Sequence, residues 1–242
     1  MKGLVLDVET SYVEAAVWSL WDNGIPLDRL LGPKRMICWA AKWIGKKGVI
    51  FRREGEKDYL TALHKLLEEA DFIVTYNGKK FDIKHINKAF LLAGVMPPAP
   101  CHHVDVLQTM KQKFAFDSNK LQHISEQLGI GSKEKHEGFQ LWAKCMQGDE
   151  KAWTTMKRYN CKDVTLLEDL YQKVKGWIKN HPSHGLDSTK PVCSNCGHTK
   201  LQSRGYATTK TARYKRMQCQ ACGTWHRTRH NEVDPKNILI SL

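Results

Sequence analysis

The sequence has no apolar run that approaches the roughly 18 consecutive residues that a membrane-spanning helix needs. Its first residues also lack the pattern of a secretion signal. Hydrophobic residues make up 41% of the 242 residues and charged residues 26%, which is not the composition of a disordered chain. We therefore expect a cytoplasmic globular protein without a membrane partner, large enough for one domain and a small module.

Acidic residues are scarce, because 25 Asp and Glu stand against 38 Lys and Arg and leave a net charge of +13. This excess favours a polyanionic partner, most simply nucleic acid. Residues 181–242 concentrate it, with ten Lys or Arg and three Asp or Glu. A solvated basic surface is the alternative interpretation of the charge.

Four of the eight cysteines form two C-x-x-C pairs near the C-terminus. These are Cys193, Cys196, Cys219 and Cys222, whereas Cys38, Cys101, Cys145 and Cys161 are scattered and read as reduced thiols. Without a secretion signal, the paired spacing favours metal over disulfides, and two such knuckles resemble a zinc ribbon. We expect one structural Zn²⁺ held by four thiolates, with a thiol-redox pair as the alternative.

Basic and aromatic residues alternate between and after the two cysteine pairs. This combination suits phosphate contacts together with base stacking. A solvated basic face or a protein-docking ribbon would show a similar composition. The candidate nucleic-acid contacts are Arg204, Tyr206, Lys210, Arg213, Tyr214, Lys215, Arg216, Trp225 and Arg227.

Residues 1–180 show a strand hairpin followed by alternating strands and helices, which predicts a mixed α/β sheet with helices on both faces. Expected strands are Leu4–Glu9, Met36–Ile44, Gly48–Arg53, Phe72–Tyr76 and His102–Val106; expected helices begin near Asp58, Lys80, Asp105, Leu121 and Glu150. Asp58 is expected to cap its helix. Trp18 and Trp21 are expected to pack on the core, with contact to a partner as the alternative.

Two carboxylates, Asp7 and Glu9, lie two residues apart at the end of the first predicted strand. Alternation along a strand points both to the same side. Like charges on a buried strand are tolerated when a cation lies between them or when they reach solvent. The pair is therefore either half of a divalent-metal site or the polar end of an ordinary strand.

Two further acidic positions can join this pair. Asp82 lies in the first turn of a helix that follows a buried strand, where α/β sheets commonly bind ligands, although such a residue can also simply stabilise the helix dipole. Tyr159 and Asp163 are four residues apart and share one face of a long helix. A surface salt bridge is the alternative role for Asp163.

In order and spacing, Asp7-x-Glu9, Asn77-x-x-x-Phe81-Asp82 and Tyr159-x-x-x-Asp163 resemble the three exonuclease motifs of the DEDD superfamily. That superfamily has a ribonuclease H-like fold and includes the proofreading domains of DNA polymerases. The tyrosine in the third motif resembles the Tyr subtype, and the flanking residues resemble stand-alone exonucleases of bacteriophages. The resemblance implies a ribonuclease H-like domain over residues 1–180, a linker over 181–190 and a basic zinc ribbon with four cysteine ligands over 191–242.

The resemblance also implies a chemistry. Asp7 would bridge two Mg²⁺ or Mn²⁺ ions, Glu9 and Asp163 would complete the first site, and Asp82 would help to hold the second. Tyr159 would orient the attacking water and help to deprotonate it. Asn77 would either fix its loop through an Asx-type hydrogen bond or touch nucleic acid.

The expected activity is 3′→5′ hydrolysis of nucleic-acid ends, with DNA preferred over RNA and single strands over duplex. A phage-encoded enzyme would act in the cytoplasm of its bacterial host. The alternatives are a structure-selective endonuclease or an exoribonuclease on the same fold, and a non-catalytic nucleic-acid-binding protein. Protein partners are left open.

Overall fold

The computed structural model describes residues 1–21, 24–132, 134, 136–186, 188–234, 236 and 238–240. The chain forms two compact units, Met1–Leu170 (unit 1) and Tyr171–Leu242 (unit 2). Among the described residues, no helix combines the length and the apolar character that crossing a membrane requires.

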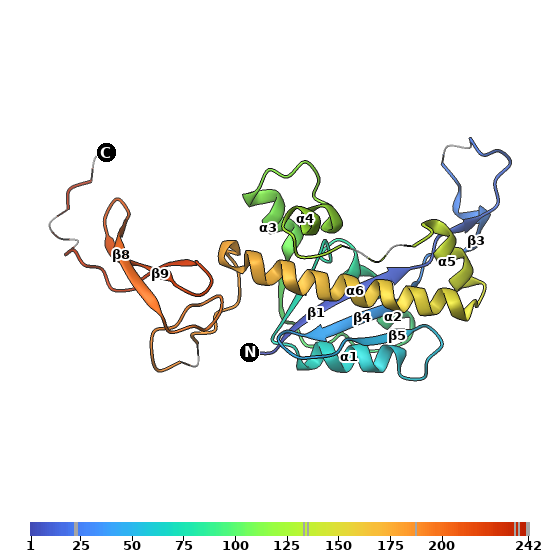
Figure 1. The fold of residues 1–242 in the computed structure, drawn as a ribbon, viewed down its shortest axis with the longest axis horizontal. Helices are drawn as coiled ribbons and strands as arrows, with labels where there is room; N and C mark the ends of the chain where they lie inside the picture. The colour runs from blue at the N-terminus through green and yellow to red at the C-terminus, as the bar shows by residue number, and fades with distance from the viewer. Residues whose placement is uncertain are drawn as a thin grey trace. The chain divides into compact units, whose positions relative to one another are not determined.

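Unit 1 is built on a mixed five-stranded sheet in the order β5-β4-β1-β6-β7. Figure 1 labels three of its strands, β1, β4 and β5. Its central strand β1 runs antiparallel to β4 and parallel to β6. The predicted hairpin of the second and third core strands is confirmed, because β4 and β5 pair antiparallel. The strands are β1 (Gly3–Thr10), β4 (Met36–Trp43), β5 (Ile50–Arg53), β6 (Phe72–Thr75) and β7 (His102–Asp105).

Helices cover both faces of this sheet, as expected for strands with apolar residues on both sides. Alternate residues of β1 (Leu4, Leu6 and Val8) pack in a core with α1 and α2, and a second core joins β4 to α5 and α6. The helices of unit 1 are α1 (Tyr59–Glu69), α2 (Asp82–Leu92), α3 (Val106–Lys113), α4 (Leu121–Gln127), α5 (Phe139–Met146) and α6 (Glu150–Val174), the last of which ends in unit 2. The odd-numbered positions of β1, including Asp7 and Glu9, therefore face α5 and α6.

Helix α5 was not predicted from the sequence. It has only eight residues, and the packing of Leu141 and Cys145 against β4 stabilises it. The expectation that Trp18 and Trp21 pack on the core is wrong, since their exposed fractions are 89% and 86%. They lie in the segment between two short paired strands, β2 (Glu14–Ala15) and β3 (Leu30–Gly32).

Two acidic residues before helices have other roles than capping. Asp58 makes no side-chain cap to α1, because its carboxylate accepts hydrogen bonds from Arg52 Nε at 2.9 and 3.0 Å. Asp105 makes no side-chain cap to α3 and instead accepts from the backbone N–H groups of Asn77 and Lys79. The carboxylate of Asp58 thus forms an ion pair, and that of Asp105 binds a loop, instead of accepting hydrogen bonds from the first amides of the following helix.

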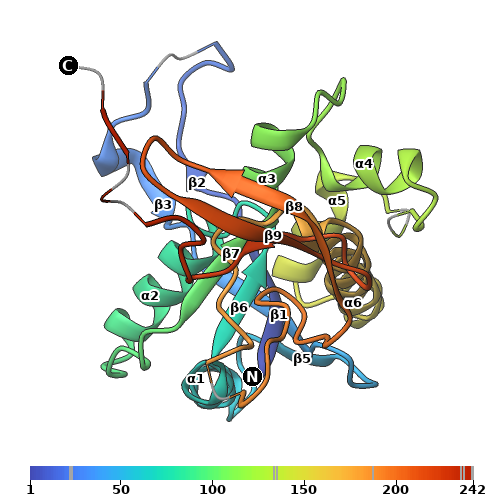
Figure 2. The same cartoon turned by 90° about the vertical axis from the view of Figure 1, so that its left-hand side faces the viewer.

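Unit 2 contains a three-stranded antiparallel sheet in the order β10-β9-β8. Figure 2 labels its two longer strands, β8 and β9. Its strands are β8 (Leu201–Thr208), β9 (Arg213–Cys219) and β10 (Trp225–Arg227), and a short 3-10 helix, η2 (Lys175–Trp177), lies at its start. Asn195 Nδ2 donates to the carbonyl oxygens of Lys175 and Ile178, both at 2.8 Å. This side chain therefore fixes the first cysteine loop to the η2 turn, in place of a large apolar core.

Candidate metal centres

The first two carboxylates lie side by side on β1, as the sequence predicts. Asp7 and Glu9 are half-buried and stand opposite Ala40 and Cys38 of β4. Burial raises the pKa of the Cys38 thiol well above its usual range, and the carboxylates of Glu9 and Asp7 raise it further. The pair thus imposes a negative potential on this face of the sheet.

Helix α6 supplies the third carboxylate. Oxygen atoms of Asp7, Glu9 and Asp163 all lie within 4.8 Å of one another. Asp163 is buried, and the helical face that carries it also carries Tyr159 and Asn160. Three carboxylates and no sulfur ligand form a donor set that suits Mg²⁺ or Mn²⁺.

Asn160 positions Asp7 from the neighbouring element. It is fully buried, and its Nδ2 donates a hydrogen bond of 2.6 Å to Asp7 Oδ2. Because this amide donates to one oxygen of the carboxylate, it fixes the orientation in which Asp7 faces the other two acidic side chains.

Asp82 lies near the cluster without joining the group of three. It is 3% exposed, and its Oδ1 accepts a 3.0 Å hydrogen bond from the Val8 backbone N–H, between Asp7 and Glu9 in sequence. Burial raises the pKa of Asp82 to about 7, and the nearby Asp105 carboxylate adds to the rise. The side chain therefore contacts the strand that carries the first two carboxylates.

The loop after β6 borders the site. Asn77 has a φ of 71°, and the next residue is Gly78, where a Cβ would lie 2.3 Å from Thr75 Oγ1. Asp105 fixes this loop by accepting from the Asn77 N–H at 2.9 Å and the Lys79 N–H at 3.3 Å. Only an Asn-Gly pair or a similar sequence fits such a turn at low strain.

A cavity of about 470 Å³ opens at the carboxylates, and we call it the carboxylate cavity. Its lining consists of Asp7, Tyr76, Asn77, Leu107, Lys120, Leu121, Gln122, His136, Tyr159 and Asp163. Lys120 contributes a cation, while Asn77 and Gln122 contribute amides. The cavity thus offers polar and cationic groups close to three carboxylates.

Two aromatic side chains hold Tyr159 edge-on at this cavity. The ring centroids of His136 and Trp142 lie 4.7 and 5.8 Å from the Tyr159 centroid. Burial, followed by the carboxylate of Asp163, raises the pKa of Tyr159 far above its usual value. The phenol is therefore protonated at neutral pH when no cation is nearby.

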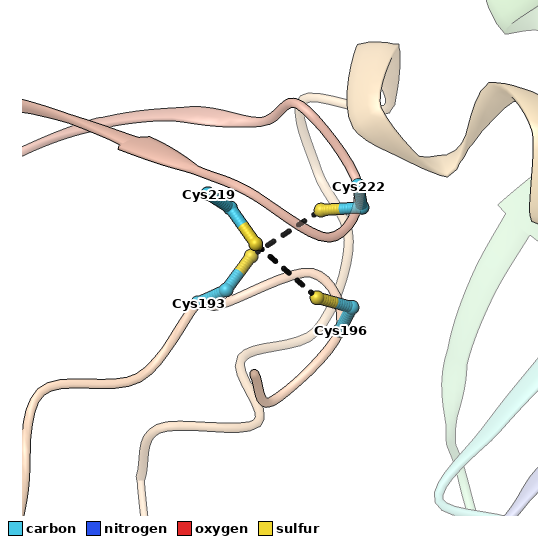
Figure 3. A group of neighbouring side chains, drawn as sticks. All are labelled: Cys193, Cys196, Cys219 and Cys222. Carbon is cyan, nitrogen blue, oxygen red and sulfur yellow. Dashed lines mark hydrogen bonds between the residues drawn. The ribbon is translucent and has the colours of Figure 1, made fainter. Parts of the chain in front are cut away.

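The four paired cysteines come together in unit 2 (Figure 3). The Sγ atoms of Cys193 and Cys222 lie 3.5 Å apart, and those of Cys196 and Cys219 lie 3.6 Å apart. A tetrahedral Zn²⁺ with Zn–S bonds of about 2.3 Å separates its sulfurs by about 3.8 Å. The four thiols therefore have the spacing that a structural zinc ion requires.

The two cysteine loops have the same backbone geometry. The N–H of Gly197 donates to Cys193 O at 2.8 Å, and the N–H of Gly223 donates to Cys219 O at 3.0 Å. Both glycines have positive φ angles of 73° and 77°. These glycines close the knuckles, which is the reason for a C-x-x-C-G sequence.

The sheet of unit 2 carries three guanidinium–aromatic pairs. Arg213 lies 4.8 Å from the ring centroid of Tyr206, Arg216 lies 5.0 Å from that of Trp225, and Arg227 lies 4.0 Å from that of Tyr214. Each of these predicted contact residues thus has an aromatic or cationic neighbour. Their role as nucleic-acid contacts stays a prediction, as it does for Arg204, Lys210 and Lys215.

Sequence reasoning missed several residues that shape the carboxylate cavity. Asn160 lies three residues before Asp163, so the helical period placed it on the same face, and this signal was available. Trp142 lies in the unpredicted helix α5 and His136 lies just before it, and neither gave a periodic signal. The sequence pattern predicts Asp105 as the start of a helix and gives no sign that its carboxylate fixes the loop at Asn77.

The fold and the carboxylates on its central strand define a ribonuclease H-like protein. The RNase_H superfamily matches residues 42–175, more than half of the chain, and the protein belongs to this superfamily. Among solved structures, the family B DNA polymerase of the hyperthermophilic archaeon Pyrobaculum calidifontis is similar, with a TM-score of 0.53 and 16% identity. The match covers 72% of this chain and 24% of the polymerase, and it shows the fold alone. No protein of curated function matches the sequence.

Proposed function

We propose that the protein is a metal-dependent 3′→5′ exonuclease of the Tyr-type DEDD superfamily. The observation that carries the proposal is the convergence of Asp7 and Glu9 from β1 with Asp163 from α6 beside Tyr159. Membership of the RNase_H superfamily supports a nuclease. The polarity and the preference for single-stranded DNA rest on the resemblance of the three motifs to the DEDD superfamily.

In this proposal Asp7, Glu9 and Asp163 hold one divalent cation, and Asp82 helps to hold a second. Bound cations would activate water and stabilise the leaving oxygen of a phosphodiester. Asn160 keeps Asp7 oriented for this task. Asp82 is tied to β1 through Oδ1, so its contribution to a metal site would come through Oδ2.

Tyr159 acts in the proposal as a donor that orients water or phosphate. Its phenol proton can be donated in a hydrogen bond, and the side chain lines the same cavity as Asp7 and Asp163. The edge contacts of His136 and Trp142 keep the ring in place. Lys120 offers its charge to a phosphate in the same cavity.

In this proposal the zinc ribbon, residues 191–242, binds the nucleic-acid backbone. A guanidinium that lies on an aromatic ring loses little freedom on binding, and its N–H groups remain available for phosphate oxygens. The contact of Arg227 with Tyr214 is the closest of the three pairs. We therefore assign these arginines to phosphate contacts, with one face of each ring supporting a cation and the other left for a base.

A substrate panel tests the catalytic proposal. End-labelled and circular single strands, each as DNA and as RNA, are incubated with Mg²⁺, Mn²⁺ or no divalent ion. We expect metal-dependent shortening of linear DNA from its 3′ end. Cleavage of the circles would favour the endonuclease, faster loss of RNA would favour the exoribonuclease, and no cleavage would favour the binding protein.

Replacement of single carboxylates separates chemistry from binding. Asp7→Asn and Asp163→Asn are expected to lower hydrolysis by at least about a thousandfold, because each deletes a charged metal ligand. Affinity for DNA in Ca²⁺ buffer should stay within about threefold of wild type, because the ribbon is unchanged. Asp169→Asn, which changes an exposed carboxylate of α6 outside the cavity, is the matched control.

A further inference from the structure

A second cavity, of about 670 Å³, lies in unit 1 and shares no lining residue with the carboxylate cavity. It is lined by residues 33–36 at the start of β4, by Glu54 just after β5, by the start of α1 and by the part of α2 from His85 onward. We call it the α1–α2 cavity. Its size is within the range of sites that bind small molecules or anchoring side chains.

The floor of the α1–α2 cavity is apolar. Met36 and Tyr59 are buried there, and Leu60 and Ala89 extend the surface. The Tyr59 hydroxyl donates to the Met36 carbonyl oxygen at 2.9 Å, so this hydroxyl is already committed within the protein. The floor can therefore receive a bulky apolar group and offers it few hydrogen bonds.

The rim of the cavity is cationic. Lys88 Nζ donates to the Lys34 carbonyl oxygen at 2.7 Å, and Lys34 Nζ lies 5.4 Å from the Phe81 ring centroid. In the part of the chain that the structure describes, neither lysine forms an ion pair with a carboxylate, whereas the neighbouring Arg35 pairs with Glu54 at 2.8 Å. Two lysine charges at the rim are thus left without neutralisation.

The two lysine charges also affect the pKa of a neighbouring histidine. Burial lowers the pKa of His85, and Lys34 and then Lys88 lower it further. Beyond the rim, Leu92 lines the cavity and yet is 77% exposed. An apolar floor, an exposed leucine and a positive rim occur together on one face of α2.

We propose that the α1–α2 cavity docks an acidic peptide segment of a partner protein. A bulky apolar side chain of the peptide fills the cavity against Met36 and Leu60, and its neighbouring carboxylates pair with Lys34 and Lys88. Charge complementarity of this kind speeds association and selects partners, and the apolar anchor supplies the affinity. The site is independent of the metal cluster and of the proposed nuclease activity.

A nucleotide fits these features less well than a peptide. Recognition of a base requires several donors and acceptors, but the Tyr59 hydroxyl and the Lys34 carbonyl already have partners, and the His85 imidazole is a single group. An aromatic or branched aliphatic side chain makes no such demand. The lysines would pair with peptide carboxylates as readily as with phosphates.

Selection from a peptide library tests the proposal on the full-length, zinc-loaded protein. Random eight-residue peptides displayed on phage are selected on wild type, and the enriched peptides are synthesised with fluorescein for anisotropy. We expect enrichment of Asp or Glu next to an aromatic or large aliphatic residue. Selected peptides without acidic residues would overturn the proposal.

Matched variants locate the binding. Lys88→Glu reverses an exposed rim charge and should weaken binding at least about fivefold, whereas Lys84→Glu, exposed on the same helix outside the cavity, should leave it unchanged. Ala89→Phe fills the cavity and should weaken binding at least about tenfold. If Ala89→Phe folds poorly, the comparison of Lys88→Glu with wild type still decides the test. Equal affinity of wild type and Lys88→Glu would overturn the proposal, as would displacement of the peptide by a mononucleotide at similar concentration.

Discussion

At the scale of single residues, the acidic side chains of unit 1 take different roles because their surroundings differ. Asp7 and Glu9 are half-buried and lie at a cavity, whereas Asp82 is buried and bonded to the Val8 N–H. Asp105 binds two backbone N–H groups of the neighbouring loop. The same functional group thus serves as a candidate metal ligand, a strand contact or a loop anchor.

Replacement of Asn160 by Ala tests the orientation of Asp7. The variant loses the 2.6 Å hydrogen bond, and loss of such an outer contact weakens metal sites by about 10–100-fold. We expect the Mn²⁺ concentration for half-maximal cleavage to rise by that factor. Thr154→Ala, an exposed change on the same helix, is the control, and an unchanged Mn²⁺ dependence in Asn160→Ala would refute the role.

We expect His103 to make the stability of the protein depend on pH. Burial lowers the pKa of His103 to about 4, against the usual 6.5 that the unfolded chain retains. Between these values the unfolded chain binds a proton that the folded protein does not, so the free energy of unfolding falls as the pH falls from about 6.5 towards 4. Above pH 6.5 the histidine is neutral in both the folded and the unfolded state, so it does not lower the stability. Below pH 4 it lowers the free energy of unfolding by about 2–3 kcal/mol, a value reduced for the partial exposure of the side chain.

Urea unfolding at pH 7.5, 6 and 5 measures this effect in wild type and in His103→Gln. The variant should lose much of the decrease between pH 7.5 and 5. His102→Gln changes an exposed histidine of the same strand and serves as the control. If the free energy of unfolding depended on pH in the same way in His103→Gln and His102→Gln, groups other than His103 would cause the effect.

At the scale of elements, short turns hold the functional segments where regular structure ends. The Asn77–Gly78 turn lies between β6 and α2, and the cysteine knuckles end in Gly197 and Gly223. In unit 2 the η2 turn packs closely on the second knuckle, because a Cβ on Gly176 would lie 2.1 Å from the Cys222 carbonyl oxygen. The backbone at this point leaves no room for a side chain.

Gly176→Ala should therefore separate the second knuckle from η2. We expect a loss of about 1–3 kcal/mol in the stability of unit 2, since a rigid backbone atom must move. Faster zinc release to a chromophoric chelator would report it. Gly185→Ala, where the nearest atom to a new Cβ lies at 3.4 Å, should release zinc at the wild-type rate; equal rates for both variants would contradict the contact.

At the scale of the whole molecule, we expect unit 1 to hydrolyse nucleic acid and unit 2 to bind it. Unit 1 buries apolar cores on the faces of one sheet, and unit 2 combines a small sheet with four cysteines. We expect the folding of unit 2 to depend on zinc, because a module of this size buries too little apolar surface alone.

Removal of zinc should unfold unit 2 and spare unit 1. After chelation and with Mg²⁺ restored, we expect at least about tenfold weaker binding of single-stranded DNA, a lower salt dependence of binding and residual cleavage at high enzyme concentration. Deletion of residues 181–242 tests the same point without a chelator. Unchanged affinity in both cases would refute a nucleic-acid role for the ribbon.

The spacing of residues in the sequence determined a large part of this picture. Alternation along a strand placed Asp7 and Glu9 on one side, and the helical period placed Asp163 beside Tyr159. The α/β class with a mixed sheet followed from apolar patterns, and the cysteine spacing predicted the four-thiol cluster that the structure contains. These features are local, so a short stretch of chain is enough to specify them.

Only the tertiary structure decided which distant groups meet. Asn160 donates to Asp7 across 153 positions of sequence, and Asp105, at the end of β7, binds the loop at Asn77. The α1–α2 cavity likewise arises from three elements that carry no common motif. Such contacts depend on packing between elements. The periodic pattern of one helix or strand shows which face is buried, but it does not specify which other element packs against that face.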